Sequence, residues 1–222
     1  MSGYGPNRSG SQPAPIELRI LSAAEAQRWV HGWPTAVVSL VDPGDEHLLT
    51  TTPRTDLLQE RLFLADVTDP AHPHAVTSGH IDQLVRFARQ LPRGNPSDGT
   101  RLLVHCRGGI GRSPAAAMVV LVAAGWRPDA ALRSVLAARQ GRKVQPNGLV
   151  LLRADQLLTP EDPQGLLAVW LRWASQQAWW HPVPTAPLRE AMAGRLPAER
   201  CVPLIQAQTH RERGVDRGPF RP

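Results

Sequence analysis

Apolar residues fall into short runs of strand length that alternate with longer segments of helical period. The strand-like runs cover residues 16–21, 36–41, 61–67 and 100–106. Helices are expected directly after Ser22 and at 79–91, 113–124, 128–139 and 147–158. Strands that alternate with helices favour a parallel arrangement with helices on its faces. The pattern therefore predicts an α/β fold with a central, mostly parallel sheet flanked by helices.

The run at 100–106 is nearly all apolar after Arg101, as expected for a central strand buried on both faces. In sheets of this type, ligands bind at the carboxyl ends of the strands, beside the helix that follows. We therefore expect the functional site where this strand ends.

Composition changes along the chain and suggests four segments. An amphipathic helix rich in tryptophan is expected at 166–180. We interpret its apolar stripe as part of the hydrophobic core. The alternatives are a helix that binds a partner and a helix that lies on a membrane surface. The segments are a flexible leader at 1–15, a main domain at 16–159, an accessory Trp-rich helix at 160–180 and a loosely ordered Pro/Arg-rich tail at 181–222.

Overall composition excludes several classes of protein. Hydrophobic residues make up 42% and charged residues 20%, which argues against wholesale disorder, collagen and a coiled-coil rod. No apolar window approaches the roughly 18 residues that a membrane span needs. Two cysteines cannot build a disulfide scaffold, and no apolar run follows Met1, so we expect a cytoplasmic protein.

The net charge of +6 comes from 24 arginines and the single lysine Lys143 against 19 acidic residues. Arginine suits planar, bidentate contact with phosphate. A GC-rich coding bias with solvated arginines gives the same balance, and no specific nucleic-acid partner is predicted.

The stretch that carries chemistry is HCRGGIGRS, residues 105–113, between the buried strand and the next helix. Three glycines in this loop allow successive backbone N–H groups to turn inward around an anion. The N-terminus of the following helix adds partial positive charge at the same place. Arg112 closes the loop and is expected to fork onto two phosphoryl oxygens.

Cys106 begins this loop, and the same positive field favours its thiolate form. A thiolate at the floor of an anion cradle can attack phosphorus and form a phosphocysteine that water later hydrolyses. The spacing Cys-x5-Arg by itself is weak evidence for such a site, because a chain so rich in arginine often has an arginine at that distance by chance. The buried strand, the glycines and the helix provide the specificity, against the alternative of a structural cysteine in a Gly-rich turn.

HCRGGIGRS resembles the HCxxGxxR[ST] signature of the cysteine-dependent protein tyrosine phosphatase superfamily, above all its dual-specificity-like and small bacterial branch. The resemblance extends over residues 16–158 and does not cover the chain after Pro160. It implies a phosphatase fold with a strand, phosphate loop and helix at the active site. It also implies chemistry without a cofactor or metal, so the histidines at 72, 74 and 80 are interpreted as a polar loop.

The resemblance assigns roles to matching positions. It implies that Cys106 is the nucleophile, that Arg112 stabilises the transition state and that Ser113 helps the thiolate to leave. His105 matches a residue that supports the loop. An equally good interpretation is that it is a histidine of the core at the end of a strand. The substrate-binding positions implied in the loop are Arg107, Gly108, Gly109, Ile110 and Gly111.

The implied general acid is an aspartate after the preceding strand, and two stand in RLFLADVTDP. Asp66 directly closes the apolar run and is favoured over Asp69, which suits an Asp-Pro turn. Further along, the segment around Gln145 and Asn147 resembles the one that buttresses the phosphate loop, so these two residues are assigned a supporting role.

These features predict a protein tyrosine phosphatase, with dual specificity left open, that acts on a phosphorylated protein or another phosphomonoester. Basic residues at Arg107, Arg142 and Lys143 are expected at the pocket rim and favour acidic substrates. One alternative is a phosphoinositide or inositol-phosphate phosphatase of the same fold, although Ile110 occupies a site where such enzymes often carry lysine. The others are a phosphate-binding pseudophosphatase and a rhodanese-like sulfurtransferase, whose loop lacks the arginine-serine closure. The oligomeric state is not predicted.

Overall fold

The computed structural model describes residues 15–45, 57–92, 99–159 and 164–177. The leader predicted at 1–15, except for its last residue, and the tail predicted at 181–222 lie outside the described residues.

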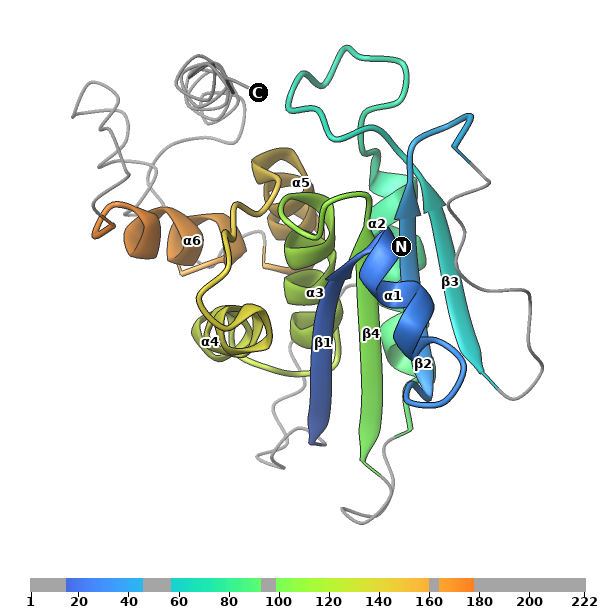
Figure 1. Ribbon diagram of the computed structural model, residues 1–222. Coiled ribbons are helices and arrows are strands. Elements are labelled where there is room, and N and C mark those ends of the chain that lie inside the picture. The colour runs from blue at the N-terminus through green and yellow to red at the C-terminus, as the bar shows by residue number, and fades with distance from the viewer. Residues whose placement is uncertain (1–14, 46–56, 93–98, 160–163, 178–222) are drawn as a thin grey trace, which may run out of the picture.

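Four parallel strands form the sheet, in the order β1-β4-β2-β3 (Figure 1). β4 lies between β1 and β2, and its residues are buried except Arg101, as predicted for a central strand. The predicted α/β class with a parallel sheet is confirmed. The strands are β1 (Ile16–Ser22), β2 (Ala36–Val41), β3 (Leu58–Phe63) and β4 (Thr100–Cys106).

The helices of the described residues cover both faces of the sheet unequally (Figure 1). α1 packs on β1 and β4 from one face, whereas α2, α3 and α4 cover the other face and α5 and α6 pack outside them. Their bounds are α1 (Ala23–Trp29), α2 (Ser78–Gln90), α3 (Arg112–Ala123), α4 (Pro128–Arg139), α5 (Gly148–Leu158) and α6 (Leu166–Ala174).

The alternation of side chains along β2 divides the core in two. Val38 and Leu40 point into the large cluster formed with α2 to α6, whereas Val37 points into a small cluster with Ala26 and Val30 around α1. Successive residues of a strand face opposite sides of a sheet, so both faces of this strand require apolar residues. This is why residues 36–41 read as one continuous apolar run.

One strand boundary was predicted wrongly. The run at 61–67 overlaps the strand only at 61–63, because β3 spans Leu58–Phe63 and pairs residue by residue with β2. β3 is an edge strand, so its first half carries polar residues that hid it from the apolar pattern. Leu64 donates one further backbone bond to Val41, and Asp66 lies in the loop beyond.

α6 is shorter than the helix predicted at 166–180 and ends at Ala174, and residues 178–180 lie outside the described part. It packs against α4 and α5, and its apolar residues join the large core cluster. The proposed boundary after residue 159 stays a prediction, but α6 contributes to the same core. None of the helices in the described residues is long and apolar enough to cross a bilayer.

Candidate active site

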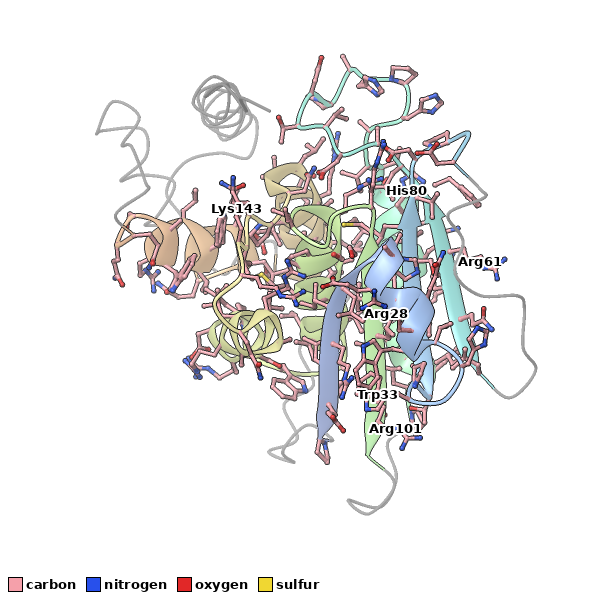
Figure 2. The ribbon with its side chains drawn as sticks, viewed as in Figure 1. Arg28, Trp33, Arg61, His80, Arg101 and Lys143 are labelled. Atoms are coloured by element: carbon pink, nitrogen blue, oxygen red, sulfur yellow. The ribbon has the colours of Figure 1, made fainter. Side chains whose placement is uncertain are left out.

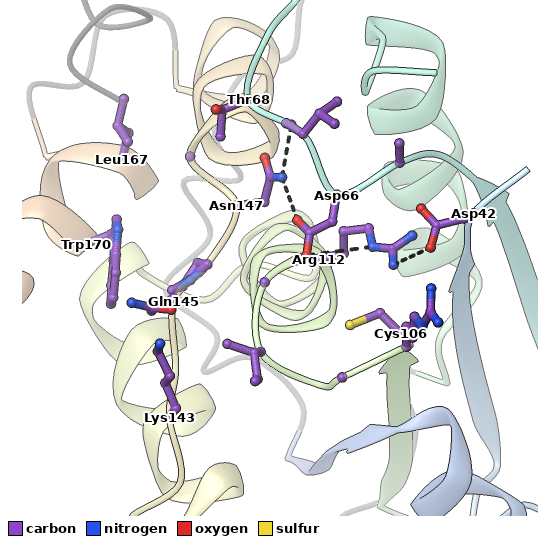
Figure 3. Close-up of a pocket in the computed structure, with 18 of the residues that line it drawn as sticks. Asp42, Asp66, Thr68, Cys106, Arg112, Lys143, Gln145, Asn147, Leu167 and Trp170 are labelled. Carbon is purple, nitrogen blue, oxygen red and sulfur yellow. Dashed lines mark hydrogen bonds and ion pairs between the residues drawn. The ribbon is translucent and has the colours of Figure 1, made fainter. Parts of the chain in front are cut away.

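The carboxyl ends of three neighbouring strands meet at one pocket of about 730 Å³. β2 is followed by Asp42, β3 by the loop that carries Asp66, and β4 ends with Cys106. Figure 3 shows these side chains grouped at one side of the pocket. Parallel strands place their carboxyl ends at one edge of a sheet, so residues distant in sequence converge there.

Cys106 lies at the floor of this pocket and is 2% exposed. The backbone N–H of Gly109 donates to Cys106 Sγ at 3.2 Å, and Ser113 Oγ lies 3.2 Å from the same sulfur. Among the loop glycines, Gly109 alone has a positive φ, of 72°. The structure therefore shows a hydrogen-bonded sulfur inside a curled loop.

α3 begins directly at the end of this loop. Its N-cap is Gly111, which has no side chain to cap the helix, so the first-turn amides are free of a side-chain cap. Such amides, together with the helix dipole, favour an anion at this position. Gly111 also lets Asp66 approach, because a Cβ there would lie 2.6 Å from Asp66 Oδ2.

Arg112 is 2% exposed and is held by two partners. Its Nη1 donates to the carbonyl of Leu64 at 2.7 Å and its Nη2 to Asp42 Oδ2 at 2.8 Å. Its Nε lies 4.0 Å from Asp66 Oδ2 and has no hydrogen-bond partner among the described residues. Both Nη groups of the guanidinium are thus anchored, and Nε is buried beside Asp66.

Asp42 was missed by the sequence analysis, although a signal for it existed. It is the first residue after the apolar run 36–41, at the carboxyl end of a parallel strand. Polar residues at that position are candidates for the site in any sheet of this type.

The structure separates the two aspartates that competed for the role of general acid. Asp66 lines the pocket beside Arg112, whereas Asp69 Oδ1 accepts the N–H of Ala71 at 2.9 Å in an exposed turn. An aspartate that bonds the backbone two residues on is typical of a turn. The geometry therefore favours Asp66 as the general acid, whereas Asp69 stabilises its own turn.

Asn147 connects three parts of the site. Its Nδ2 donates to Asp66 Oδ1 at 2.9 Å and to the carbonyl of Val67 at 3.1 Å. Its Oδ1 caps α5, and its backbone N–H donates to the carbonyl of Gly111 at 3.1 Å. Asn147 thus fixes the Asp66 loop against the Cys106 loop, while Gln145 bonds the same loop through its backbone N–H to Ile110.

His105 is fully buried on β4, where its Nε2 lies 2.8 Å from Ser39 Oγ of β2. Burial lowers its pKa to about 4. The imidazole is therefore neutral near pH 7 and links two strands beneath the loop, which agrees with a supporting role.

A second buried arginine lies behind the loop. Arg139 Nη1 donates to the carbonyl of Ile20 at 3.2 Å and lies 3.9 Å from Glu25. A Cβ on Gly109 would approach this Nη1 to 2.8 Å, so the loop packs directly on Arg139. The pKa of Glu25 is lowered to about 2, mainly by a hydrogen bond from the backbone N–H of Ser22. A hydrogen bond from the Arg142 side chain lowers this pKa further.

The expected basic rim is only partly correct. Arg142 bonds Glu25 and lines a separate groove beside β1 and α4, so it does not line the pocket. Arg107 and Lys143 do line it. Opposite Cys106, three residues of α6 complete the pocket wall: Leu167, Trp170 and Leu171. Within the described part of the chain, no three His, Cys, Asp or Glu side chains gather as ligands for a metal.

Neither a protein-family model nor a curated protein matches the sequence. Several solved phosphatase structures are similar. Human DUSP28 is 19% identical, with 64% of this chain and 92% of that chain covered and a TM-score of 0.45. PTPMT1 in complex with PI(5)P is 18% identical, with 66% and 91% covered and a TM-score of 0.46. Tk-PTP in the active form is 19% identical, with 65% and 92% covered and a TM-score of 0.41. With superpositions this loose, the functional assignment depends on the side chains of the chain itself.

Proposed function

We propose that this chain is a cysteine-dependent phosphomonoesterase of the protein tyrosine phosphatase type. One observation carries the proposal: the pocket that holds Cys106 also holds the guanidinium of Arg112 and the carboxylate of Asp66. A nucleophile, an anion clamp and a proton donor around one pocket are the parts that phosphoryl transfer through a covalent intermediate requires.

In the first step, the sulfur of Cys106 attacks the phosphorus atom and the bond from phosphorus to the ester oxygen breaks. Arg112 Nε and the first-turn amides of α3 hold the non-bridging oxygens, where negative charge develops. Asp66 transfers its proton to the departing oxygen, so the leaving group departs as a neutral alcohol or phenol.

In the second step, water attacks the phosphocysteine and Asp66, now a carboxylate, accepts the proton of that water. The bond between sulfur and phosphorus breaks, and inorganic phosphate forms. Ser113 Oγ, 3.2 Å from the sulfur, donates a hydrogen bond that stabilises the departing thiolate.

For the substrate, we propose phosphotyrosine in proteins, with dual specificity toward phosphoserine and phosphothreonine open to test. Support comes from the exposed basic residues Arg107 and Lys143 at the pocket, which favour acidic surroundings of the phosphorylated residue. A comparison of phosphotyrosine peptides, phosphothreonine peptides and micellar phosphoinositides by kcat/KM ranks these classes directly.

The decisive experiment follows the phosphoenzyme. Wild type and Cys106→Ser are mixed with p-nitrophenyl phosphate in excess chelator, quenched in acid and analysed by peptide mass spectrometry. We expect one phosphoryl group on Cys106 in wild type, and background hydrolysis in Cys106→Ser. Cys201→Ser is the matched control, since it removes the second cysteine of the sequence and should retain turnover. Near-full activity in Cys106→Ser would overturn the proposal.

A further inference from the structure

The pocket is much larger than the phosphoryl group needs. Its volume of about 730 Å³ falls in the range of roughly 300–1,000 Å³ typical of sites that enclose a whole small molecule. The anion loop occupies one side only, as Figure 3 shows, and Lys143, Leu167 and Trp170 lie on the other. The leaving group of a phosphomonoester bound at the loop can therefore contact the opposite wall of the pocket.

That wall is apolar and firmly held. Leu167, Trp170 and Leu171 of α6 line it, and only 5%, 4% and 3% of their respective surfaces are exposed. Trp170 stacks on Trp173 with ring centroids 5.2 Å apart. The wall is thus a preformed surface suited to a flat apolar group.

Asp155 of α5 sets the position of this wall. Its Oδ1 accepts the N–H of Leu166 at 2.7 Å and its Oδ2 accepts the N–H of Leu167 at 2.9 Å. Gly165 permits the approach, because a Cβ there would lie 2.7 Å from the carboxylate. The first turn of α6 is therefore capped by the neighbouring helix, which fixes Leu167 relative to the pocket.

Lys143 supplies the charge on this side. It is the single lysine among 25 basic residues, it is exposed, and Figure 2 places it beside α6. It forms no ion pair with any residue that the structure describes, whereas Arg112 is paired with Asp42 and Arg107 lies 3.9 Å from Asp45. An ammonium group is a compact charge that accepts an anion from many directions.

We infer that α6 and Lys143 form a leaving-group subsite that takes an aromatic group bearing a second anionic substituent. The inference rests on the proposed function and adds the substrate class to it. The aromatic ring lies against Leu167 and Trp170, and the anionic substituent pairs with the ammonium of Lys143.

The charge is tested with two aryl phosphates of similar shape, 4-(carboxymethyl)phenyl phosphate and neutral 4-ethylphenyl phosphate. In Lys143→Gln we expect KM for the carboxylated substrate to rise by about two- to fivefold, the size of an exposed ion pair, with kcat unchanged. KM for the neutral substrate should not change. The effect should fade in high salt, and Lys143→Arg should retain most of the discrimination.

Arg142→Gln is the matched control, because it removes the same charge one residue away, at a side chain that bonds Glu25 outside the pocket. It should leave the ratio of the two KM values unchanged. An equal shift for both substrates in Lys143→Gln, or the same ratio change in Arg142→Gln, would overturn the assignment of Lys143.

The apolar wall is tested by Leu167→Ala, which should lower the preference for 2-naphthyl over phenyl phosphate by about threefold or more. Val169→Ala is the control, since Val169 is buried on α6 without lining the pocket. An unchanged preference in Leu167→Ala would show that the apolar wall does not contact the leaving group. The proposed function would still hold in that case, because the enzyme would still turn over. A wild type that hydrolyses none of these substrates would overturn the proposed function and this inference together.

Discussion

The loop that follows Cys106 has two faces, and a buried arginine lies at each. Arg112 in front and Arg139 behind are 2% and 6% exposed, and both have carboxylates as neighbours. The partners of Arg112 are Asp42 and Asp66 in the pocket, whereas Glu25, the partner of Arg139, lies outside it. The same type of side chain therefore lies in two different environments, one on each side of the loop.

The difference lies in what each guanidinium faces. Arg112 lines the pocket, and in the proposed mechanism its Nε binds a phosphoryl oxygen. Arg139 contacts the carbonyl of Ile20 and packs against Gly109 from behind, and it does not line the pocket that holds Cys106. Burial lowers the pKa of Arg139, and the nearby Glu25 opposes that shift. We therefore expect Arg112 to affect the reaction and Arg139 to affect the stability of the loop.

Replacing each arginine by lysine tests this contrast most strongly. Arg112→Lys keeps the charge but loses the planar fork, and should lower kcat/KM by about 10²–10³-fold. The two hydrogen bonds of the buried Arg112 guanidinium also contribute to stability, so the unfolding midpoint should fall as well. Arg139→Lys should lower the free energy of unfolding by about 1–3 kcal/mol and kcat/KM only severalfold. Kinetics with p-nitrophenyl phosphate and urea denaturation measure both. Equal kinetic losses in the two variants would contradict the division of roles.

The front face is tested further by Asp66→Asn. A phenol such as tyrosine needs a proton to leave, so kcat for a phosphotyrosine peptide should fall by about 10²-fold or more. The loss should be smaller for p-nitrophenyl phosphate, whose leaving group is a stable anion. Asp69→Asn is the control and should retain activity, because the Asp69 carboxylate accepts a backbone bond within its own turn and does not line the pocket. A larger loss in Asp69→Asn than in Asp66→Asn would reverse the assignment.

The back face is tested by Gly109→Ala. The added Cβ would lie 2.8 Å from Arg139 Nη1 and from the backbone carbon of Leu21, at a φ of 72° that alanine rarely adopts. We expect a loss of unfolding free energy of about 2–4 kcal/mol together with reduced kcat. Gly125→Ala, at a φ of 100° with no atom within 4 Å, should cost only about 1–2 kcal/mol and leave kcat unchanged. Similar losses of stability in both variants would show that contact with Arg139 is unimportant.

The smallest effect is expected from acidification, through His105 beneath the loop. The folded protein holds the pKa of His105 at about 4, below the 6.5 of an unperturbed histidine, so the unfolded chain binds the proton first as pH falls. Stability from this group is complete above pH 6.5 and is lost as pH falls toward 4, by about 2 kcal/mol between pH 7 and pH 5. In His105→Gln, this part of the pH dependence of urea denaturation should disappear. An unchanged profile would contradict a neutral, buried imidazole.

Local pattern predicted the helices and the loop well, because both depend on neighbours in sequence. The helix predicted at 128–139 has those bounds in the structure, and Pro128 is at its first turn. The strand at 61–67 was misplaced because β3 is recognised by its pairing with β2 rather than by its own apolar residues. Trp180 of the predicted α6 stripe lies outside the described residues.

The sequence by itself determined the alternation of strands and helices, and the loop that presents Cys106 and Arg112 at the start of a helix. These features follow from side-chain periodicity and from backbone freedom at glycine, which act within a few residues. Only the tertiary structure decided that Asp42 pairs with Arg112 across 70 positions, that Asp66 and not Asp69 enters the pocket, and that Arg142 turns away from it. Those choices depend on strand order and on the packing of α4, α5 and α6, which bring together residues that no local pattern connects.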